Sequence, residues 1–94
     1  MPPPILLSHP DSLRHDPGPH PDAPERMEAI ERELAARGGL GYERRESPEV
    51  KRSVLEAVHP PQYLDWLEAL SARGGGMIDG DTIASAGSWG AALH

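Results

Sequence analysis

The sequence predicts an α/β fold, a parallel sheet flanked by helices, with most of this chain in helices. A strand is indicated by the wholly apolar run 5–7, which follows three prolines and is typical of a buried strand. Helices are indicated by apolar residues at helical spacing over residues 23–37, 48–58 and 62–73. With 94 residues, the chain has room for at most one small domain.

The first predicted helix has the clearest boundaries. Residues 8–21 are rich in His, Asp, Pro and Gly, so we expect a long irregular loop before it. Asp22 is expected to cap the helix and Glu25 to complete a capping box, while Pro24 is tolerated in the first turn. The glycines at 38 and 39 end the helix.

The rest of the chain alternates between helices and turns. Residues 40–45 are predicted to form an edge strand, and Ser47 is predicted to cap the helix over 48–58, which His59 closes. The next helix ends at three consecutive glycines, and we expect a turn-rich loop over 77–85. Residues 88–94 are typical of the start of a packed helix.

Composition excludes several classes of function. The net charge of -6 argues against non-specific binding to nucleic acid or to an anionic membrane. No signal peptide and no run of ~20 apolar residues is present, so we expect a cytoplasmic protein. Because there is no cysteine, neither disulfides nor thiolate zinc sites can form. Leu, Ile, Val and Phe together make up only 17 of 94 residues, so we expect poor stability of the isolated chain.

Three segments in order resemble the bacterial class II histone deacetylase family, which includes acetoin utilisation proteins and acetylpolyamine amidohydrolases. They are His-Pro-Asp-Ala-Pro-Glu-Arg-Met-Glu-Ala-Ile at 20–30, Val-His-Pro-Pro-Gln-Tyr at 58–63, and Asp-Gly-Asp-Thr-Ile-Ala-Ser-Ala-Gly-Ser-Trp-Gly-Ala-Ala at 79–92. The resemblance implies the three-layer arginase/deacetylase fold. Residues 1–94 would be its amino-terminal portion, truncated before the zinc site, with residues 8–22 as the first active-site loop.

The resemblance also implies a chemistry. In that family Zn²⁺, held by two Asp and one His, activates a water that attacks an acetyl amide, and the substrate would be an acetyl-lysine protein or an acetylpolyamine. The family's adjacent His pair and Asp-x-Asp-x-His run do not occur here. We therefore expect this chain to bind no zinc and to be inactive alone. A stand-alone helical interaction module and a non-functional remnant are the alternatives, and the oligomeric state stays open.

Four residues are candidates for the site. By the resemblance, Asp81, with Asp79 as the second choice, lies at the substrate rim and accepts hydrogen bonds from the substrate backbone. The alternative is a turn-forming role, which is common for aspartate. Arg26 lies on the active-site loop near an internal cavity, where it could attract a carboxylate, and His20 positions that loop. The alternative for Arg26 is an arginine on the helix surface, paired with a nearby Glu.

Two clusters could suggest a metal. The histidines and aspartates of the first loop are good ligand types, but their spacing matches no ligand geometry on a known turn; they are His9, Asp11, His15, Asp16, His20 and Asp22. The pair Asp79 and Asp81 is followed neither by a histidine at zinc-site spacing nor by the glutamate of a calcium loop, since position 90 is glycine. We expect no metal at either cluster.

Overall fold

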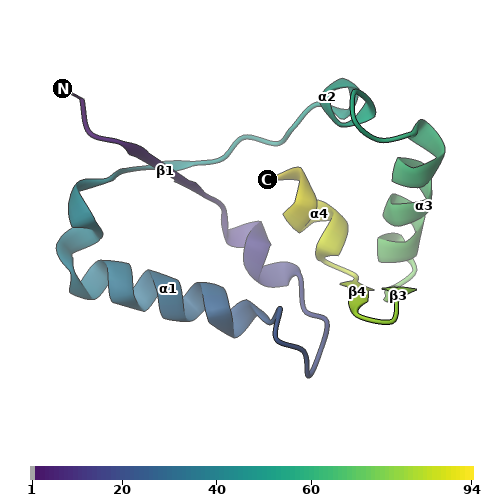
Figure 1. The fold of residues 1–94 in the computed structure, drawn as a ribbon, viewed down its shortest axis with the longest axis horizontal. Coiled ribbons are helices and arrows are strands. Elements are labelled where there is room, and N and C mark those ends of the chain that lie inside the picture. Colours follow the sequence, from purple (N-terminus) through teal and green to yellow (C-terminus); the bar gives the residue numbers. More distant parts are fainter. Residues whose placement is uncertain (1) are drawn as a thin grey trace.

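The computed structural model describes residues 2–94; Met1, the first residue of the predicted deacetylase-like portion, lies outside this range. The predicted α/β class is confirmed. Figure 1 shows α4 in the middle of the arrangement, between the amino-terminal part of the chain and α3. The elements are β1 (Ile5–Ser8), a 3₁₀ helix (Pro10–Arg14), α1 (Pro24–Ala36), a 3₁₀ turn (Gly38–Gly41), β2 (Glu43–Glu46), α2 (Arg52–Glu56), α3 (Pro61–Ala72), β3 (Gly75–Asp79), β4 (Thr82–Ser85) and α4 (Ser88–Leu93).

The strands form two separate pairs. β1 and β2 run parallel, with a register from Ile5 opposite Glu43 to Ser8 opposite Glu46, so both predicted strands are confirmed. β3 and β4 form an antiparallel hairpin where we expected only a turn-rich loop, and that prediction was wrong. The Asp-Gly pair at 79–80 is a hairpin signal. The sequence did not indicate β3, because this strand begins with glycines, a residue type that is depleted in strands.

α1 begins and ends close to where the sequence predicts, but the predicted cap is wrong. The residue before the helix is Ala23, and no side chain caps the helix end. The Asp22 carboxylate instead accepts hydrogen bonds from Arg26 at 3.0 Å and from His15 at 3.0 Å. The Asp22 carboxylate is thus engaged by the Arg26 guanidinium and the His15 ring in place of the helix-end amide, and the predicted capping box with Glu25 does not form.

The predicted helix over 48–58 is reduced to the five residues of α2, and Ser47 does not cap it. The Ser47 amide instead donates to the Ser8 carbonyl at 2.8 Å and so extends the parallel ladder. The Val50 amide donates to the Leu93 carbonyl at 2.8 Å, which holds this segment extended beside α4. Tertiary hydrogen bonds therefore override a local helix signal that three β-branched valines had already weakened.

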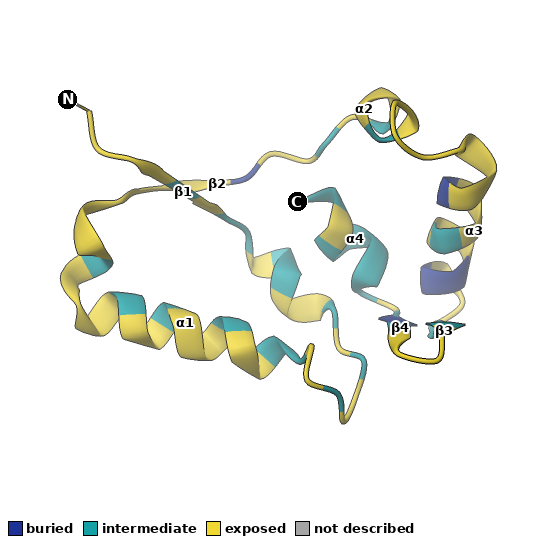
Figure 2. Cartoon of the chain, viewed as in Figure 1, coloured by how far each residue is buried: buried dark blue, intermediate teal, exposed yellow. Residues whose placement is uncertain are grey.

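The apolar core is small and lies in the carboxyl-terminal half. Leu64 and Leu70 of α3 and Ala84 of β4 are 3%, 6% and 7% exposed. Within residues 2–94, Figure 2 shows buried positions only on α3, on β4 and just after β2. β1, predicted to be buried, leaves Ile5 48% and Leu7 56% exposed. None of the helices in residues 2–94 combines the length and apolar character that a membrane span requires.

Candidate functional site

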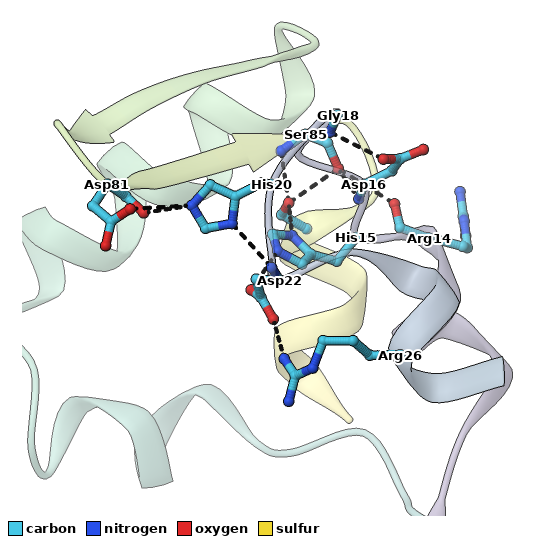
Figure 3. A network of polar contacts seen from close by, with 10 residues as sticks. Arg14, His15, Asp16, Gly18, His20, Asp22, Arg26, Asp81 and Ser85 are labelled. Carbon is cyan, nitrogen blue, oxygen red and sulfur yellow. Dashed lines mark hydrogen bonds and ion pairs between the residues drawn. The ribbon is translucent and has the colours of Figure 1, made fainter. Parts of the chain in front are cut away.

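His15 fastens the first loop to the start of α4 (Figure 3). Its Nδ1 lies 2.6 Å from the Ser88 hydroxyl, and its Nε2 lies 3.0 Å from Asp22 Oδ2. Because a carboxylate can only accept, the proton is on Nε2, and Nδ1 accepts from the Ser88 hydroxyl. The loop 8–22, which holds the 3₁₀ helix as well as irregular backbone, is thereby tied to a residue far away in the sequence.

Hydrogen bonds link Ser88 to His15 and His15 to Asp22, which is the arrangement that activates a serine nucleophile in some enzymes. Here, however, the Ser88 oxygen also accepts the backbone N–H of Ser85 at 2.6 Å and lies 3.1 Å from the Ser85 hydroxyl. The Ser85 hydroxyl in turn accepts the Asp16 amide at 2.9 Å. The Ser85 hydroxyl has one proton, which it can donate either to the Ser88 oxygen or to the Arg14 carbonyl, 3.3 Å away. Because the Ser88 hydroxyl donates to His15 and accepts the Ser85 amide, it acts as a joint between loop, hairpin and helix.

His20 joins the same loop to the tip of the hairpin. Its Nε2 donates to the Asp81 carbonyl at 2.9 Å and lies 3.4 Å from the Asp81 carboxylate, while its Nδ1 accepts the Asp22 amide at 3.0 Å. The ring is mostly buried, with 19% of its side chain exposed. The structure therefore brings together two of the predicted site residues, His20 and Asp81, from segments that the sequence leaves far apart.

The two candidate rim carboxylates differ in what they touch. The Asp79 carboxylate accepts the Asp81 amide at 2.9 Å, and this hydrogen bond, followed by those from Thr82, lowers the pKa of Asp79. The Asp81 side chain is 98% exposed. Asp79 therefore closes the turn of the hairpin as an Asx residue, and Asp81 presents its carboxylate to whatever approaches the tip.

Arg26 lies one turn along α1 from Asp22. Its guanidinium donates to Asp22 Oδ1 at 3.0 Å, and 63% of the side chain is exposed. The structure thus shows the paired surface arginine of the alternative interpretation, with an aspartate in place of the expected glutamate. Because Asp22 also binds His15, Arg26 belongs to the network that fixes the loop.

Beside this network lies an apolar cavity of about 590 Å³. Its walls come from α2, α3, the hairpin and α4, and the polar side chains of His15, Asp22 and Ser88 line it as well. Leu64 and Trp89 are among the apolar residues around it. The arrangement suits an apolar group held next to a few hydrogen-bonding groups.

A third cluster, His9, Asp11 and His94, was not foreseen, because His94 comes from the far end of the chain. One ligand atom from each residue lies within 4.8 Å of the others. The two imidazole rings are stacked, with centroids 3.6 Å apart and planes 9° apart. An ion about 2.0–2.1 Å from a ring nitrogen lies in the plane of that ring. Because the stacked rings are nearly parallel, no position within bonding distance of both rings lies in both planes.

Hydrogen bonds give the same result. His9 Nδ1 accepts the Asp11 amide at 3.0 Å, which places the proton of the neutral ring on Nε2. His94 Nδ1 lies 2.9 Å from the Ser47 carbonyl and donates to it. Only His94 therefore offers a lone pair beside the carboxylate, so the cluster does not fit Zn²⁺, which needs three protein ligands in a catalytic site. The stacked rings instead fasten the amino-terminal segment to α4.

Comparisons with known proteins agree with this architecture. The crystal structure of the HDA15 HD domain, a histone deacetylase domain, superposes with a TM-score of 0.82 and 25% sequence identity, covering 95% of this chain and 28% of that one. The fold is that of part of a histone deacetylase domain. An uncharacterised protein of Synechocystis sp. is 35% identical in an alignment 82 residues long, which covers 82% of this chain and 27% of the relative. No protein-family model matches. The chain spans about a quarter of each of these longer proteins.

Proposed function

We propose that this chain is the amino-terminal part of a zinc-dependent deacetylase of the bacterial class II histone deacetylase family. It would act on acetyl-lysine in proteins or on acetylpolyamines. The observation that carries the proposal is the superposition of 95% of the chain on a histone deacetylase domain. The three sequence segments that resemble the family support it, and two of them meet where His20 contacts Asp81.

Within this proposal, Asp81 accepts hydrogen bonds from the substrate at the rim of the site. Its carboxylate is exposed, while its carbonyl and its amide are held by His20 and Asp79. Two backbone anchors fix the position of the residue, and its carboxylate, 3.4 Å from His20 Nε2, stays 98% exposed, which is the arrangement that a recognition group needs. A carboxylate would suit the N–H groups of a peptide or the cationic nitrogens of a polyamine.

Zinc ligands are not supplied by this chain. The His9, Asp11 and His94 cluster does not fit the ion, and neither an adjacent His pair nor an Asp-x-Asp-x-His run occurs in the sequence. In the proposed enzyme the ion and the groups that move protons belong to the part of the longer protein beyond the matched segment. The residues described above position the loop and the hairpin tip.

A chimera tests the proposal. This chain replaces the matched segment in the Synechocystis protein, and release of acetate from an acetyl-lysine peptide and from acetylpolyamines is measured with and without zinc. We expect zinc-dependent activity in the chimera and none in the 94-residue chain. A folded, zinc-loaded chimera that hydrolyses neither substrate refutes the proposal.

Variants of the chimera test the role of Asp81. A hydrogen bond to a charged group contributes about 1.5–3 kcal/mol, so Asp81→Ala should lower kcat/KM by roughly 10- to 150-fold. Glu68→Gln is the matched control, because Glu68 is an exposed carboxylate on α3 away from the hairpin tip. Equal kcat/KM in Asp81→Ala and the control would show that Asp81 does not contact substrate.

A further inference from the structure

The turn between β3 and β4 contains the only Asp-Gly pair in the sequence, Asp79 followed by Gly80. Both residues are exposed. A Cβ placed on Gly80 would meet open space, so no neighbouring atom crowds the peptide bond between the two residues. The tip of the hairpin is therefore accessible to water and free to undergo local chemistry.

An Asp-Gly pair is able to rearrange without an enzyme. The glycine nitrogen attacks the side-chain carboxyl carbon of the aspartate, a C–N bond forms, and water leaves, which closes a five-membered succinimide ring. Water then opens the ring at either carbonyl and gives aspartate or isoaspartate, whose main chain runs through the former side chain. Glycine permits this attack most readily because it has no Cβ beside the nitrogen.

The folded hairpin holds the Asp79 carboxylate in its unreactive form. This carboxylate accepts the Asp81 amide at 2.9 Å and hydrogen bonds from Thr82, and these contacts lower the pKa of Asp79. Hydrogen bonds to a charged group favour its charged form. Because water can leave only from the protonated carboxyl group, the contacts within the turn slow ring closure.

The backbone of Asp79 is also unsuited to ring closure. Asp79 is the last residue of β3 and lies opposite Thr82 of β4. Extended backbone directs the nitrogen of the next residue away from the Cβ atom. A five-membered ring instead needs the Gly80 nitrogen and the Asp79 Cβ to be nearly eclipsed. Ring closure therefore requires Asp79 to leave the strand.

We propose that Asp79 is a site of spontaneous isomerisation to isoaspartate, and that the β3–β4 hairpin slows this reaction until it opens. Opening frees the carboxylate and the backbone together. The reaction adds one atom to the main chain and converts the carboxylate that accepts the Asp81 amide into a main-chain carbonyl. Because His20 donates to the Asp81 carbonyl, the altered turn also disturbs the first loop. The product carries an exposed isoaspartyl carboxylate, which suits an enzyme that methylates such groups with S-adenosylmethionine.

The rate of isoaspartate formation tests the proposal. The 94-residue chain is incubated at mildly acidic pH, both in native buffer and in concentrated guanidinium chloride. Because the sequence contains no asparagine, every isoaspartate comes from an aspartate. Trypsin releases residues 74–94 as one peptide, in which isoaspartate is located by mass spectrometry and counted by enzymatic methyl transfer. We expect the native chain to react on the order of 10-fold more slowly than the denatured chain.

Equal rates in native and denatured chains overturn the proposal, and so does the absence of isoaspartate at position 79 in the denatured chain. Hydrogen exchange of the Asp81 amide gives an independent measure of opening, because this amide donates to the Asp79 carboxylate. Its protection factor should match the slowing of isomerisation within about 3-fold. A protected amide without slowing, or slowing without protection, contradicts the proposed role of the hairpin.

Two substitutions separate the chemistry from the fold. Gly80→Ala places a methyl group beside the attacking nitrogen and meets open space, so it should slow isomerisation in native and denatured chains alike. Thr82→Val keeps a β-branched side chain but removes a hydrogen bond to the Asp79 carboxylate. It should speed the reaction roughly 3-fold in the native chain and leave the denatured rate unchanged. Unchanged native rates in both variants refute the proposal, and none of these readouts depends on deacetylase activity.

Discussion

Two buried serines should respond differently when each is replaced by alanine. Ser71 is 2% exposed, and its hydroxyl donates to the carbonyls of Ser85 and Ala86, at 2.8 Å and 3.0 Å. It also accepts the Trp89 amide at 3.0 Å. Ser71 thus holds the end of α3 against the start of α4. Ser47 is 7% exposed, and its hydroxyl has no hydrogen-bond partner.

The magnitudes follow from these contacts. Ser71→Ala leaves the Trp89 amide and a carbonyl of the hairpin without partners, at a cost of about 1–3 kcal/mol for each fully buried group. Because both groups are only partly buried, we expect about 2 kcal/mol in total, which corresponds to roughly 30-fold faster exchange. Ser47→Ala removes an unsatisfied hydroxyl, so it should be neutral or stabilising.

Native-state hydrogen exchange is the suitable assay, because it reports local opening without requiring cooperative unfolding of the whole chain. The amides of Leu70 and Trp89 are followed in both variants and in Ser53→Ala, a control at an exposed serine of α2. The reasoning is refuted if Ser71→Ala exchanges no faster than the control. It is also refuted if Ser47→Ala loosens the chain as much as Ser71→Ala does.

Two further predictions concern contacts made by the amino-terminal half. Gly87→Ala should loosen α4 from the first loop, because a Cβ at position 87 would overlap the carbonyl of Arg14. Gly80→Ala is the control, because a Cβ at position 80 meets open space. The α4 amides should exchange faster in Gly87→Ala than in Gly80→Ala. The hydrogen bonds from Arg44 lower the pKa of Glu31. The ion pair therefore stabilises the folded chain fully at a pH above the ordinary glutamate pKa, and this stabilisation is lost as the pH falls through the lowered pKa. The urea midpoints of the wild-type chain and Glu31→Gln should therefore converge as the pH is lowered from neutral to below the ordinary glutamate pKa, and a constant difference would contradict this.

The sequence predicts α1 and α3 well because their boundaries depend on local chemistry. A proline opens each helix at its first residue, and glycines follow each end. The helix predicted over 48–58 failed for a non-local reason, since Val50 bonds to Leu93. Similarly, Asp22 left its predicted capping role for partners that only the folded chain brings near.

In the candidate site, too, only the features that depend on local sequence could be predicted. Residue types and spacing placed His20 on a loop and Asp81 in a turn, but no local pattern indicates that the two touch. The stacking of His9 on His94 is equally invisible in the sequence. Asp79 shows the limit of resemblance, because its carboxylate is held within its own turn while that of Asp81 is exposed.

The bond between His15 and Ser88 spans 73 positions, and this separation has a consequence during synthesis. Ribosomes add about 5–20 residues per second, so roughly 4–15 s pass between the emergence of the imidazole and that of its hydroxyl partner. During that interval the proline-rich segment lacks this anchor. The first loop of a nascent chain is therefore open to proteases and chaperones until α4 leaves the exit tunnel.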